Sequence, residues 1–599
     1  MENYIYHPFI SMTFSLILGA GTYSLGKYVL VYSKFDKILN KASYIEFQYL
    51  SFGILFSLVF LFPLISFFNI SKDILQIYAI LLCFLSIKFF NEIPLIIKKI
   101  KFQSSDILYK IFILLLVLYF LLSLAPLTSA DVLDYHIGSA LNILRFDRYV
   151  LFPEWFTSLQ SGTGETLIAL GLSIGSEQYG SIIQYSSILT ISGILLKFYR
   201  KNLGFKSKYF LPITILCCPI LIFLLSGNKP QIYFSGILFL ALSINFIRFK
   251  NEKDRLLGYL IINIIIFSCI VGKFSFNLSG FLVWVFSTLF IINKKNFFKI
   301  FLITLIPFLI IYVPFIFWKY INLGGNIFTY LYSPFPLHLP GYETFLSHNR
   351  GSQEIPFPYF LFYTTPSRIT EFLGLNVLFL ILIFFIKKKN VKINATIFLI
   401  FFFLIISNLY ASPSARYYLD PILWSTFLFL FSGYKKINQY LPKIFIPQMI
   451  AITLILLYSV INFLPGSFTV KNYKNIKNKF AYMYSGFEWI NDNIPENSNV
   501  LILNRAISQY KESSISGWFN YFTSEKESKF YKKLILKKKP IYLIYFGSNP
   551  DLRHMKNCVD GLYMKKDKVG FHATRNPFNR GNYYNVYIYN INYENLDKC

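Results

Sequence analysis

The sequence has few charged residues and none of the short motifs that mark many soluble enzymes. Only 15% of its 599 residues are Asp, Glu, Lys or Arg, whereas a soluble domain is nearer a quarter charged. It lacks a phosphate-binding glycine loop, a Cys/His spacing suited to zinc and a G-x-S-x-G nucleophile elbow. These absences exclude an ordinary soluble domain and a nucleotide-driven pump.

Acidic residues are scarce beside basic ones. There are 29 Asp and Glu against 58 Lys and Arg, a net charge of +29. In a soluble protein that excess would indicate nucleic-acid binding. Here the basic residues gather in every second short loop between apolar runs, which is the pattern of cytoplasmic loops in membrane proteins. We therefore interpret the charge as membrane topology and expect no nucleic-acid partner.

Apolar and aromatic residues are abundant, at 55% and 20% of the chain. Apolar runs of about 18–22 residues recur, and each is long enough to cross about 30 Å of hydrocarbon. The predicted fold class is a polytopic α-helical membrane protein with about fourteen transmembrane helices. The predicted spans are 8–31, 48–70, 73–90, 107–126, 177–197, 209–226, 231–249, 256–272, 276–293, 298–318, 372–386, 393–410, 416–433 and 443–464.

Three long segments outside these spans fall on the outer side if the basic loops are cytoplasmic. They are the loops 127–176 and 319–371 and the polar tail 466–599. The predicted division is N-terminal helices 1–106, a membrane core 107–465 and an extracytoplasmic α/β domain 466–599, with strands in "NVLIL", "KKPIYLIYFG" and "YYNVYIYNI". A disulfide between Cys558 and Cys599 in this tail is left open. The Lys, Ile, Asn and Phe bias indicates an AT-rich bacterial genome, so the expected location is a bacterial cell membrane.

The stretch "SADVLDYHIG" places two carboxylates directly after an apolar span. If residues 130–146 form a helix on the membrane surface, Asp131 and Asp134 lie three apart on one face. One interpretation is structural, since Asp at a helix start is a good cap. The other is functional: a carboxylate at the boundary between water and lipid that acts as a general base or a metal ligand.

Two basic residues stand out against apolar surroundings. Lys273 lies within "SCIVGKFSFNLSG", where a charge is costly unless it has a function. Arg416 lies at the end of an outer loop. Each could reach a phosphate at the membrane interface, or could place its charged end in water with no further role.

At these residues the sequence resembles the GT-C superfamily of polytopic glycosyltransferases that use lipid-linked sugars, and in particular the bacterial members related to protein mannosyltransferases. The resemblance spans residues of about 107 to 550 and rests on the order of several weak motifs. They are "SADVLDYHIGSALNIL", "SGNKPQIYFSGILFLALSI", "IVGKFSFNLSGFLVW", "SARYYLDPILW" and "FEWINDNIPENSNVLIL".

The resemblance implies a GT-C-like core that transfers a sugar from a polyprenyl-phosphate donor to a glycan, lipid or protein acceptor at the outer face of the membrane. It implies that Asp131 is the catalytic base and that Lys273 and Arg416 face the donor phosphate. Tyr135, His136 and Asp134 would shape the acceptor pocket, and Glu165 would be a second acid.

The sequence departs from the family at "NKPQ", residues 228–231, where many members carry Asp. A second carboxylate would then come from Asp134, Glu154 or Glu165, and a divalent cation as cofactor is left open. Two other functions remain alternatives: a lipid or glycan transporter or flippase, and a non-catalytic protein of envelope assembly. Transporters usually show internal repeats, and none is evident here. The identities of the sugar and of the acceptor are left open.

Overall fold

The structure is a computed structural model of the chain, and parts of the chain are not described. The described residues are 4–99, 106–199, 207–291, 296–337, 339, 358–362, 372–386, 390–410, 414–431, 435–512, 514–516, 529, 533, 537–547, 552, 558–571 and 583–594. Most of the predicted loop 319–371 and Cys599 lie outside them.

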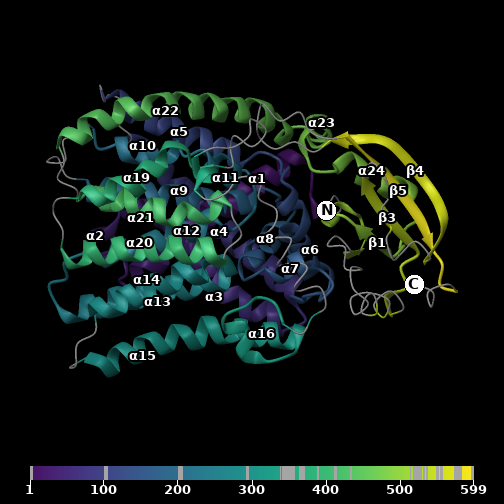
Figure 1. Cartoon of the computed structure of the whole chain (residues 1–599), viewed down its shortest axis with the longest axis horizontal. Helices are drawn as coiled ribbons and strands as arrows, with labels where there is room; N and C mark the ends of the chain where they lie inside the picture. The colour runs from purple at the N-terminus through teal and green to yellow at the C-terminus, as the bar shows by residue number, and fades with distance from the viewer. Residues whose placement is uncertain are drawn as a thin grey trace.

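Long apolar helices build most of the molecule and lie side by side in a bundle (Figure 1). Within the described ranges, nine helical segments are long and apolar enough to cross a membrane. They are α1 (Pro8–Tyr32), α3 (Tyr49–Phe67), α4 (Ser71–Lys99), α9 (Tyr179–Phe198), α13 (Glu252–Gly272), η5 (Phe274–Phe276) with α14 (Asn277–Ile291), α15 (Phe297–Pro307) continuing through η7 (Phe308–Tyr312) into α16 (Val313–Leu323), α20 (Val391–Tyr410), and α22 (Lys435–Phe463) with η13 (Leu464–Ser467).

The other five predicted spans are helical but shorter than a membrane crossing. Three are α5 (Ile107–Ser123), α12 (Ile232–Ile244) and the run of η10 (Gly374–Val377), α19 (Leu378–Leu382) and η11 (Ile383–Phe385). The predicted span 209–226 is divided into α10 (Phe210–Leu216) and α11 (Ile220–Leu225) on either side of Pro219, because proline cannot continue a helix hydrogen-bond ladder. The last is α21 (Leu419–Phe429), preceded by η12 (Ala415–Tyr418). The short helices α2 (Asp36–Ala42) and η2 (Ile45–Phe47) connect α1 and α3.

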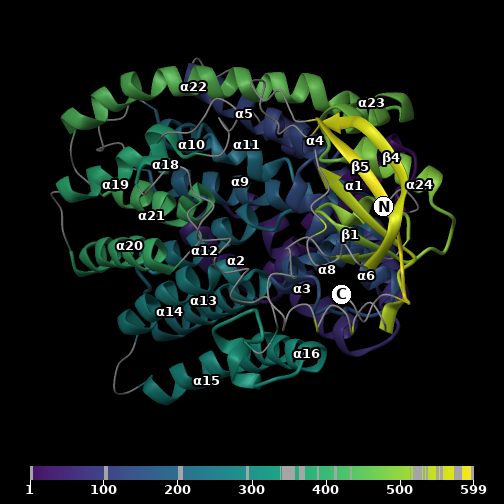
Figure 2. The same ribbon diagram turned by 45° about the vertical axis from the view of Figure 1, so that its right-hand side comes forward.

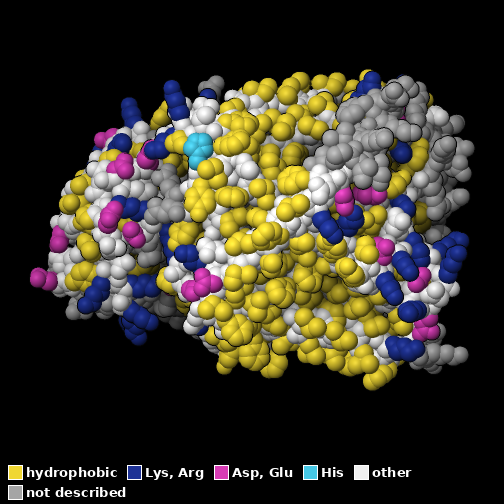
Figure 3. Space-filling model, turned by 180° about the vertical axis from the view of Figure 1, so that it is seen from behind, with side chains coloured by type: hydrophobic (Ala, Val, Ile, Leu, Met, Phe, Trp, Pro, Cys, Tyr) yellow, Lys and Arg dark blue, Asp and Glu magenta, His cyan; other side chains and the backbone are white. Residues whose placement is uncertain are grey.

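An apolar belt crosses the bundle on the face that Figure 3 shows. It is a broad band of hydrophobic side chains between two ends where Lys, Arg, Asp and Glu gather. Large apolar side chains of the bundle helices, such as Phe298, Leu309 and Phe398, are exposed. An apolar surface of this extent is typical of a lipid-facing protein. The chain is therefore a multi-pass membrane protein.

The C-terminal domain, from α23 to β5, is a mixed sheet with helices. Its helices are α23 (Val470–Phe480), α24 (Tyr484–Asn493) and the turn η14 (Ile507–Gln509). Its strands are β1 (Val500–Leu503), β2 (Ser514–Ser516), β3 (Tyr542–Gly547), β4 (Val559–Phe571) and β5 (Tyr583–Ile591), in the order β2-β1-β3-β5-β4. β1 is parallel to β2 and β3, whereas β5 is antiparallel to β3 and β4.

Three of these strands, β1, β3 and β5, lie where the sequence predicts them. Two were not predicted from the sequence: β2 has only three residues, and β4 carries the charged run Lys565 to Lys568, which hides its alternation. Cys558, at the start of β4, is disulfide-bonded, and the four cysteines of the helical bundle are free.

The segment between α5 and α9, which we call the first loop, folds into η3 (Val132–His136), α6 (Ile137–Arg145), α7 (Phe156–Leu159) and α8 (Gly164–Leu172). The helix predicted over 130–146 is present as η3 and α6, but its predicted position on the membrane surface is wrong. Every residue of α6 from Ile137 to Leu144 is buried, because α8 and the turn η14 of the C-terminal domain pack against it. Figures 1 and 2 show this loop and the sheet at the same end of the bundle.

A buried ion pair fastens the C-terminal domain to the bundle. The ammonium of Lys477 on α23 lies 2.9 Å from Oε1 of Glu177 and donates to the carbonyl of Leu127 at 2.8 Å. Glu177 also accepts from the backbone N–H of Leu127. Close by, the N–H of Tyr482 donates to the carbonyl of Thr128. These contacts fix the domain over the first loop.

Two remaining short helices of the described residues complete the bundle. They are η8 (Ile327–Leu331), directly after α16, and α18 (Tyr359–Phe362). The conformation of the second predicted outer loop between and after them is not described.

Candidate functional site

The two carboxylates of "SADVLDYHIG" lie at a widened helical turn. Asp131 directly precedes η3, which is a π-helical turn, and Asp134 lies inside it. A π-turn has more residues per turn than an α-helix and is frequent at functional sites. Residues three apart then no longer share one face, so the prediction that both carboxylates point the same way is wrong. Asp131 and Asp134 lie in different surroundings.

Asp131 contacts three basic side chains. Its Oδ1 accepts from the guanidinium of Arg505, and its Oδ2 accepts from the ammonium of Lys229 and from Nη1 of Arg416, the last at 3.0 Å. Its partners are 98, 285 and 374 positions away in the sequence. The Asp131 side chain is 17% exposed. Two bundle segments and the C-terminal domain therefore meet at one carboxylate, and we call these four residues the Asp131 cluster.

Each cation of the cluster stands at the end of a regular element. Lys229 lies in the turn between α11 and α12, and Arg416 lies in η12, where its guanidinium is 5.0 Å from the ring centre of Tyr417. Arg505 follows β1 and precedes Ala506, whose φ of 63° is in the left-handed region. A non-glycine residue in that region is uncommon, and such positions concentrate at functional sites. This turn directs Arg505 toward the first loop.

Burial lowers the pKa of Arg505 to about 10. The side chain therefore keeps its charge at neutral pH. Counting Lys229 and Arg416, three cations face one carboxylate, so the cluster carries an excess of positive charge.

Lys273 lies beside the cluster and does not contact Asp131. It ends α13 in extended backbone, and its side chain is buried. Its ammonium donates to Oε1 of Gln231 at 3.3 Å, and Nε2 of Gln231 donates to the carbonyl of Arg416 at 3.1 Å. The structure thus brings Asp131 and Arg416 together and connects Lys273 to them through Gln231.

His136 and Glu165 form a second, fully buried group. Nδ1 of His136 lies 2.6 Å from Oε1 of Glu165, whose Oε2 accepts from the N–H of Gly162 at 2.9 Å. Burial raises the pKa of Glu165 to about 7. Burial, helped by the charges of Lys273, Lys229 and Arg416, holds the pKa of His136 well below its usual value. His136 is therefore neutral near pH 7, and Glu165 is the member of the pair that titrates in this range.

Nε2 of His136 is buried and has no hydrogen-bond partner among the described residues. The ring of Tyr135 lies 4.1 Å from the ring of His136, centre to centre, and Tyr135 is buried. One side of the imidazole is thus fixed by Glu165, and its other nitrogen is available to a ligand.

Asp134 is buried apart from both groups. Its Oδ2 accepts from the hydroxyl of Thr157 at 3.1 Å, and burial raises its pKa to about 7. Glu154, the other candidate second carboxylate, pairs with Lys538 of the C-terminal domain. Neither carboxylate contacts Asp131.

A divalent cation does not fit these surroundings. Oxygen-ligated cations need several carboxylates around one point. The described part of the chain holds no group of three or more His, Cys, Asp or Glu side chains placed to bind a metal, and the neighbours of Asp131 are cations that would repel one.

Sequence reasoning missed Lys229 and Arg505. Lys229 was visible as a single charge in an outer turn, "NKPQ", which the sequence reasoning treated only as a place where a carboxylate is lacking. Arg505 lies in "LNRAIS" after a short strand, and no periodicity or motif marks it. Only the docking of the C-terminal domain brings it to Asp131.

The chain is similar to a protein family and to solved structures of a membrane protein. A family model described as the DUF1420 N-terminal domain matches residues 86–477. No curated protein matches the chain. Among solved structures, ArnT from Cupriavidus metallidurans bound to undecaprenyl phosphate shares 10% identity at a TM-score of 0.47, with 81% of this chain and 98% of that chain covered. The apo state of the same protein shares 10% identity at a TM-score of 0.45, with 79% and 96% covered.

Proposed function

We propose that this chain, which belongs to the DUF1420 family, is a membrane glycosyltransferase that moves a sugar from a polyprenyl-phosphate donor to an acceptor at the outer face of a bacterial cell membrane. One observation carries the proposal: three cations from distant segments converge on a single carboxylate where the helical bundle meets the C-terminal domain. The sugar-transfer chemistry is the one implied by the sequence resemblance.

The cations suit the phosphate of a membrane lipid. Arginine binds phosphate oxygens through paired N–H groups, and lysine adds a point charge. Lys229, Arg416 and Arg505 together exceed the charge of Asp131, so a phosphate can enter without leaving the site unbalanced. Lys273, reached through Gln231, would extend this positive region toward the bundle. The lipid tail would lie along the apolar belt.

The reaction then needs one base and one stabilised leaving group. The hydroxyl oxygen of the acceptor attacks the anomeric carbon of the donor sugar and forms the new glycosidic bond. The bond from that carbon to the phosphate oxygen breaks, and the phosphate leaves with the electron pair. Asp131 takes the hydroxyl proton. Fixed cations at the phosphate stabilise the charge that develops there in the transition state.

Both oxygens of Asp131 are engaged by cations. In the proposed mechanism the donor phosphate competes for Lys229, Arg416 and Arg505. The carboxylate is then freed to accept a proton only when the donor is in place. This order would protect the site from unproductive proton transfer.

The outer location of the site is supported by two features. The basic loops alternate along the sequence as cytoplasmic loops do. The C-terminal domain, which supplies Arg505, contains the disulfide-bonded Cys558, and disulfides persist in oxidising compartments. The outer location would be tested by labelling the Ser514→Cys variant with a thiol reagent that is applied to intact cells and does not cross the membrane.

The transfer itself is tested with the purified protein in lipid nanodiscs. The substrates are radiolabelled polyprenyl-phosphate sugars and an envelope glycan extract, and the readout is label in the glycan fraction. Asp131→Asn should lower transfer by about 10²- to 10⁴-fold, the contribution of a general base. Asp492→Asn, an exposed position on α24, is the matched control. Equal transfer by wild type and Asp131→Asn would refute the base assignment. Lipid movement between leaflets without transfer would favour a transporter.

A further inference from the structure

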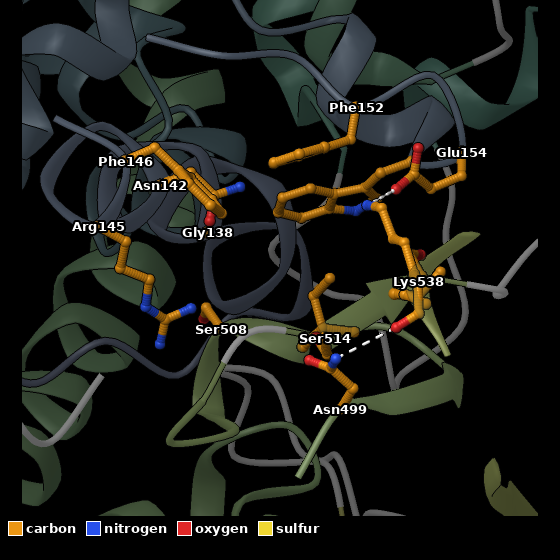
Figure 4. A pocket seen from close by; sticks show the side chains of 14 residues that line it. Gly138, Asn142, Arg145, Phe146, Phe152, Glu154, Asn499, Ser508, Ser514 and Lys538 are labelled. Carbon is orange, nitrogen blue, oxygen red and sulfur yellow. Dashed lines mark hydrogen bonds and ion pairs between the residues drawn. The ribbon is translucent and has the colours of Figure 1, made fainter. Parts of the chain in front are cut away.

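A cavity of about 300 Å³ lies between α6 and the connection from α6 to α7 on one side and the C-terminal domain on the other. Small-molecule sites begin at about this volume. Figure 4 shows Asn142, Phe146 and Phe152 on the side of the first loop, facing Asn499 and Ser514 of the C-terminal domain. The cavity is a place where both parts of the chain would contact a ligand.

One wall of the cavity is aromatic. Phe146 and Phe152 lie 5.4 Å apart, ring centre to ring centre, and Trp155 lines the same cavity. The Trp155 indole packs against Gly138, where a Cβ would lie 2.3 Å from Cη2 of the indole. The ammonium of Lys538 lies 4.5 Å from the ring centre of Phe152. These contacts fix the aromatic wall in place.

A polar group without a partner faces the cavity from α6. Asn142 is 9% exposed, and its side-chain amide makes no hydrogen bond with any residue that the structure describes. An amide offers both a donor and an acceptor, so Asn142 is matched to a ligand that carries hydroxyl groups.

The charges of the cavity do not favour an anion or an acyl chain. Lys538 is paired with Glu154, and Arg145 donates to the carbonyls of Tyr510 and Lys511 at 3.5 and 3.2 Å. The cations are thus already engaged by protein oxygens, which disfavours an anion as the ligand. An acyl chain is also disfavoured, because it would bury the amide and serine groups without hydrogen-bond partners.

The cavity reaches the segment that follows Arg505. Ser508 lines it, and its hydroxyl donates to the carbonyl of Leu133, inside η3. Ser508 lies three positions after Arg505, which contacts Asp131. A ligand in the cavity would therefore contact the turn η14, which begins two positions after Arg505.

We infer that this cavity binds a saccharide unit of the acceptor, with a sugar ring against Phe146, Phe152 and Trp155 and its hydroxyls on Asn142 and on Oδ1 of Asn499, whose Nδ2 donates to the carbonyl of Lys538 at 3.2 Å. The inference rests on the proposed function, since it assigns the acceptor of the same reaction to a glycan. Aromatic faces pack against the C–H faces of sugar rings, and planar amides bind neighbouring hydroxyls. The cavity joins these two kinds of group in one place.

The inference is tested by glycan binding without any donor. The full-length protein in nanodiscs is applied to an array of immobilised bacterial envelope glycans, from mono- to tetrasaccharides. Wild type should bind a defined subset. Asn142→Ala and Phe146→Ala should each weaken that binding about tenfold, as expected for the loss of one ligand contact. Asn493→Ala and Phe468→Ala are the matched controls, since Phe146 and Phe468 are 46% and 44% exposed.

Asp131→Asn separates this inference from the proposed function. It should lower transfer about 10²- to 10⁴-fold and leave array binding intact. If wild type binds no glycan on the array, or if Asn142→Ala and Phe146→Ala bind as wild type does, the cavity is not a saccharide site, whatever the transfer assay shows. If glycans bind through the cavity and no transfer occurs, the proposed function fails and the saccharide site stands.

Discussion

Arg505 of the C-terminal domain donates to Oδ1 of Asp131 in the first loop, across 374 positions of sequence. The domain therefore supplies one of the three cations of the cluster and does not merely cover the bundle. Lys477 and Glu177 fix the same domain from its other side. The candidate site is complete only when the domain is docked.

Replacing Arg505 should weaken binding of a lipid phosphate. Arg505→Ala removes a charged hydrogen bond, which is worth about 10- to 100-fold in affinity. The measurement is the dissociation constant of undecaprenyl phosphate in nanodiscs. Lys474→Ala, whose ammonium lies 3.4 Å from Glu488 on the domain surface, should bind as wild type. Unchanged affinity in Arg505→Ala would show that the cation has only a docking role.

Arg416 and Lys273 should differ in their effects, although the family resemblance implies that both face the donor phosphate. Arg416→Gln removes a direct neighbour of Asp131 and should weaken undecaprenyl-phosphate binding about tenfold or more. Lys273→Met removes a charge that contacts Gln231, so its effect should be smaller, about threefold or less. A larger loss in Lys273→Met than in Arg416→Gln would mean that the phosphate lies deeper, toward α13.

Glu165 should make stability depend on pH. Its pKa is raised from 4.5 to about 7 in the folded protein, so between these values the folded state holds more protons than the unfolded state. Its contribution to stability is fully present below pH 4.5 and is lost as the pH rises through about 7. Glu165→Gln should remove this part of the pH dependence of the unfolding temperature, which is measured from thermal unfolding curves at a series of pH values. Glu488→Gln on α24 should keep it, and an unchanged slope in Glu165→Gln would contradict the prediction.

Breaking the Lys477–Glu177 pair should loosen the C-terminal domain. Lys477→Met leaves the buried carboxylate of Glu177 without its cation, a change that costs about 3–5 kcal/mol. Limited proteolysis should release the domain sooner than in wild type. Lys479→Met, two positions further along α23 and exposed, is the control. If both variants resist protease equally, other contacts hold the domain.

Much of the bundle could be predicted from the sequence because long apolar runs have few other uses. All fourteen predicted spans coincide with helices, although interruptions such as Pro219 shorten several. The strand β4 was not predicted because the charged run from Lys565 to Lys568 hides its alternation of apolar and polar residues. The widened turn at Asp131 could not be foreseen, since a π-turn has no distinct spacing in one sequence.

The site was harder to predict than the fold because its contacts are long-range. Asp131 and Arg416 were selected individually, for a carboxylate and a cation at the end of apolar runs. Arg505 carries no such signal, because its role depends on how the domain docks. Asp131 and Asp134 lie in different surroundings because of how the chain packs around α6. A local sequence pattern does not show this packing.

The most direct measurement of the central claim is an electron cryomicroscopy structure of the protein in nanodiscs with undecaprenyl phosphate. We predict phosphate oxygens at about 3 Å from Lys229, Arg416 and Arg505, with Asp131 released from at least two of them. A lipid phosphate bound elsewhere, with the three cations still on Asp131, would contradict the account.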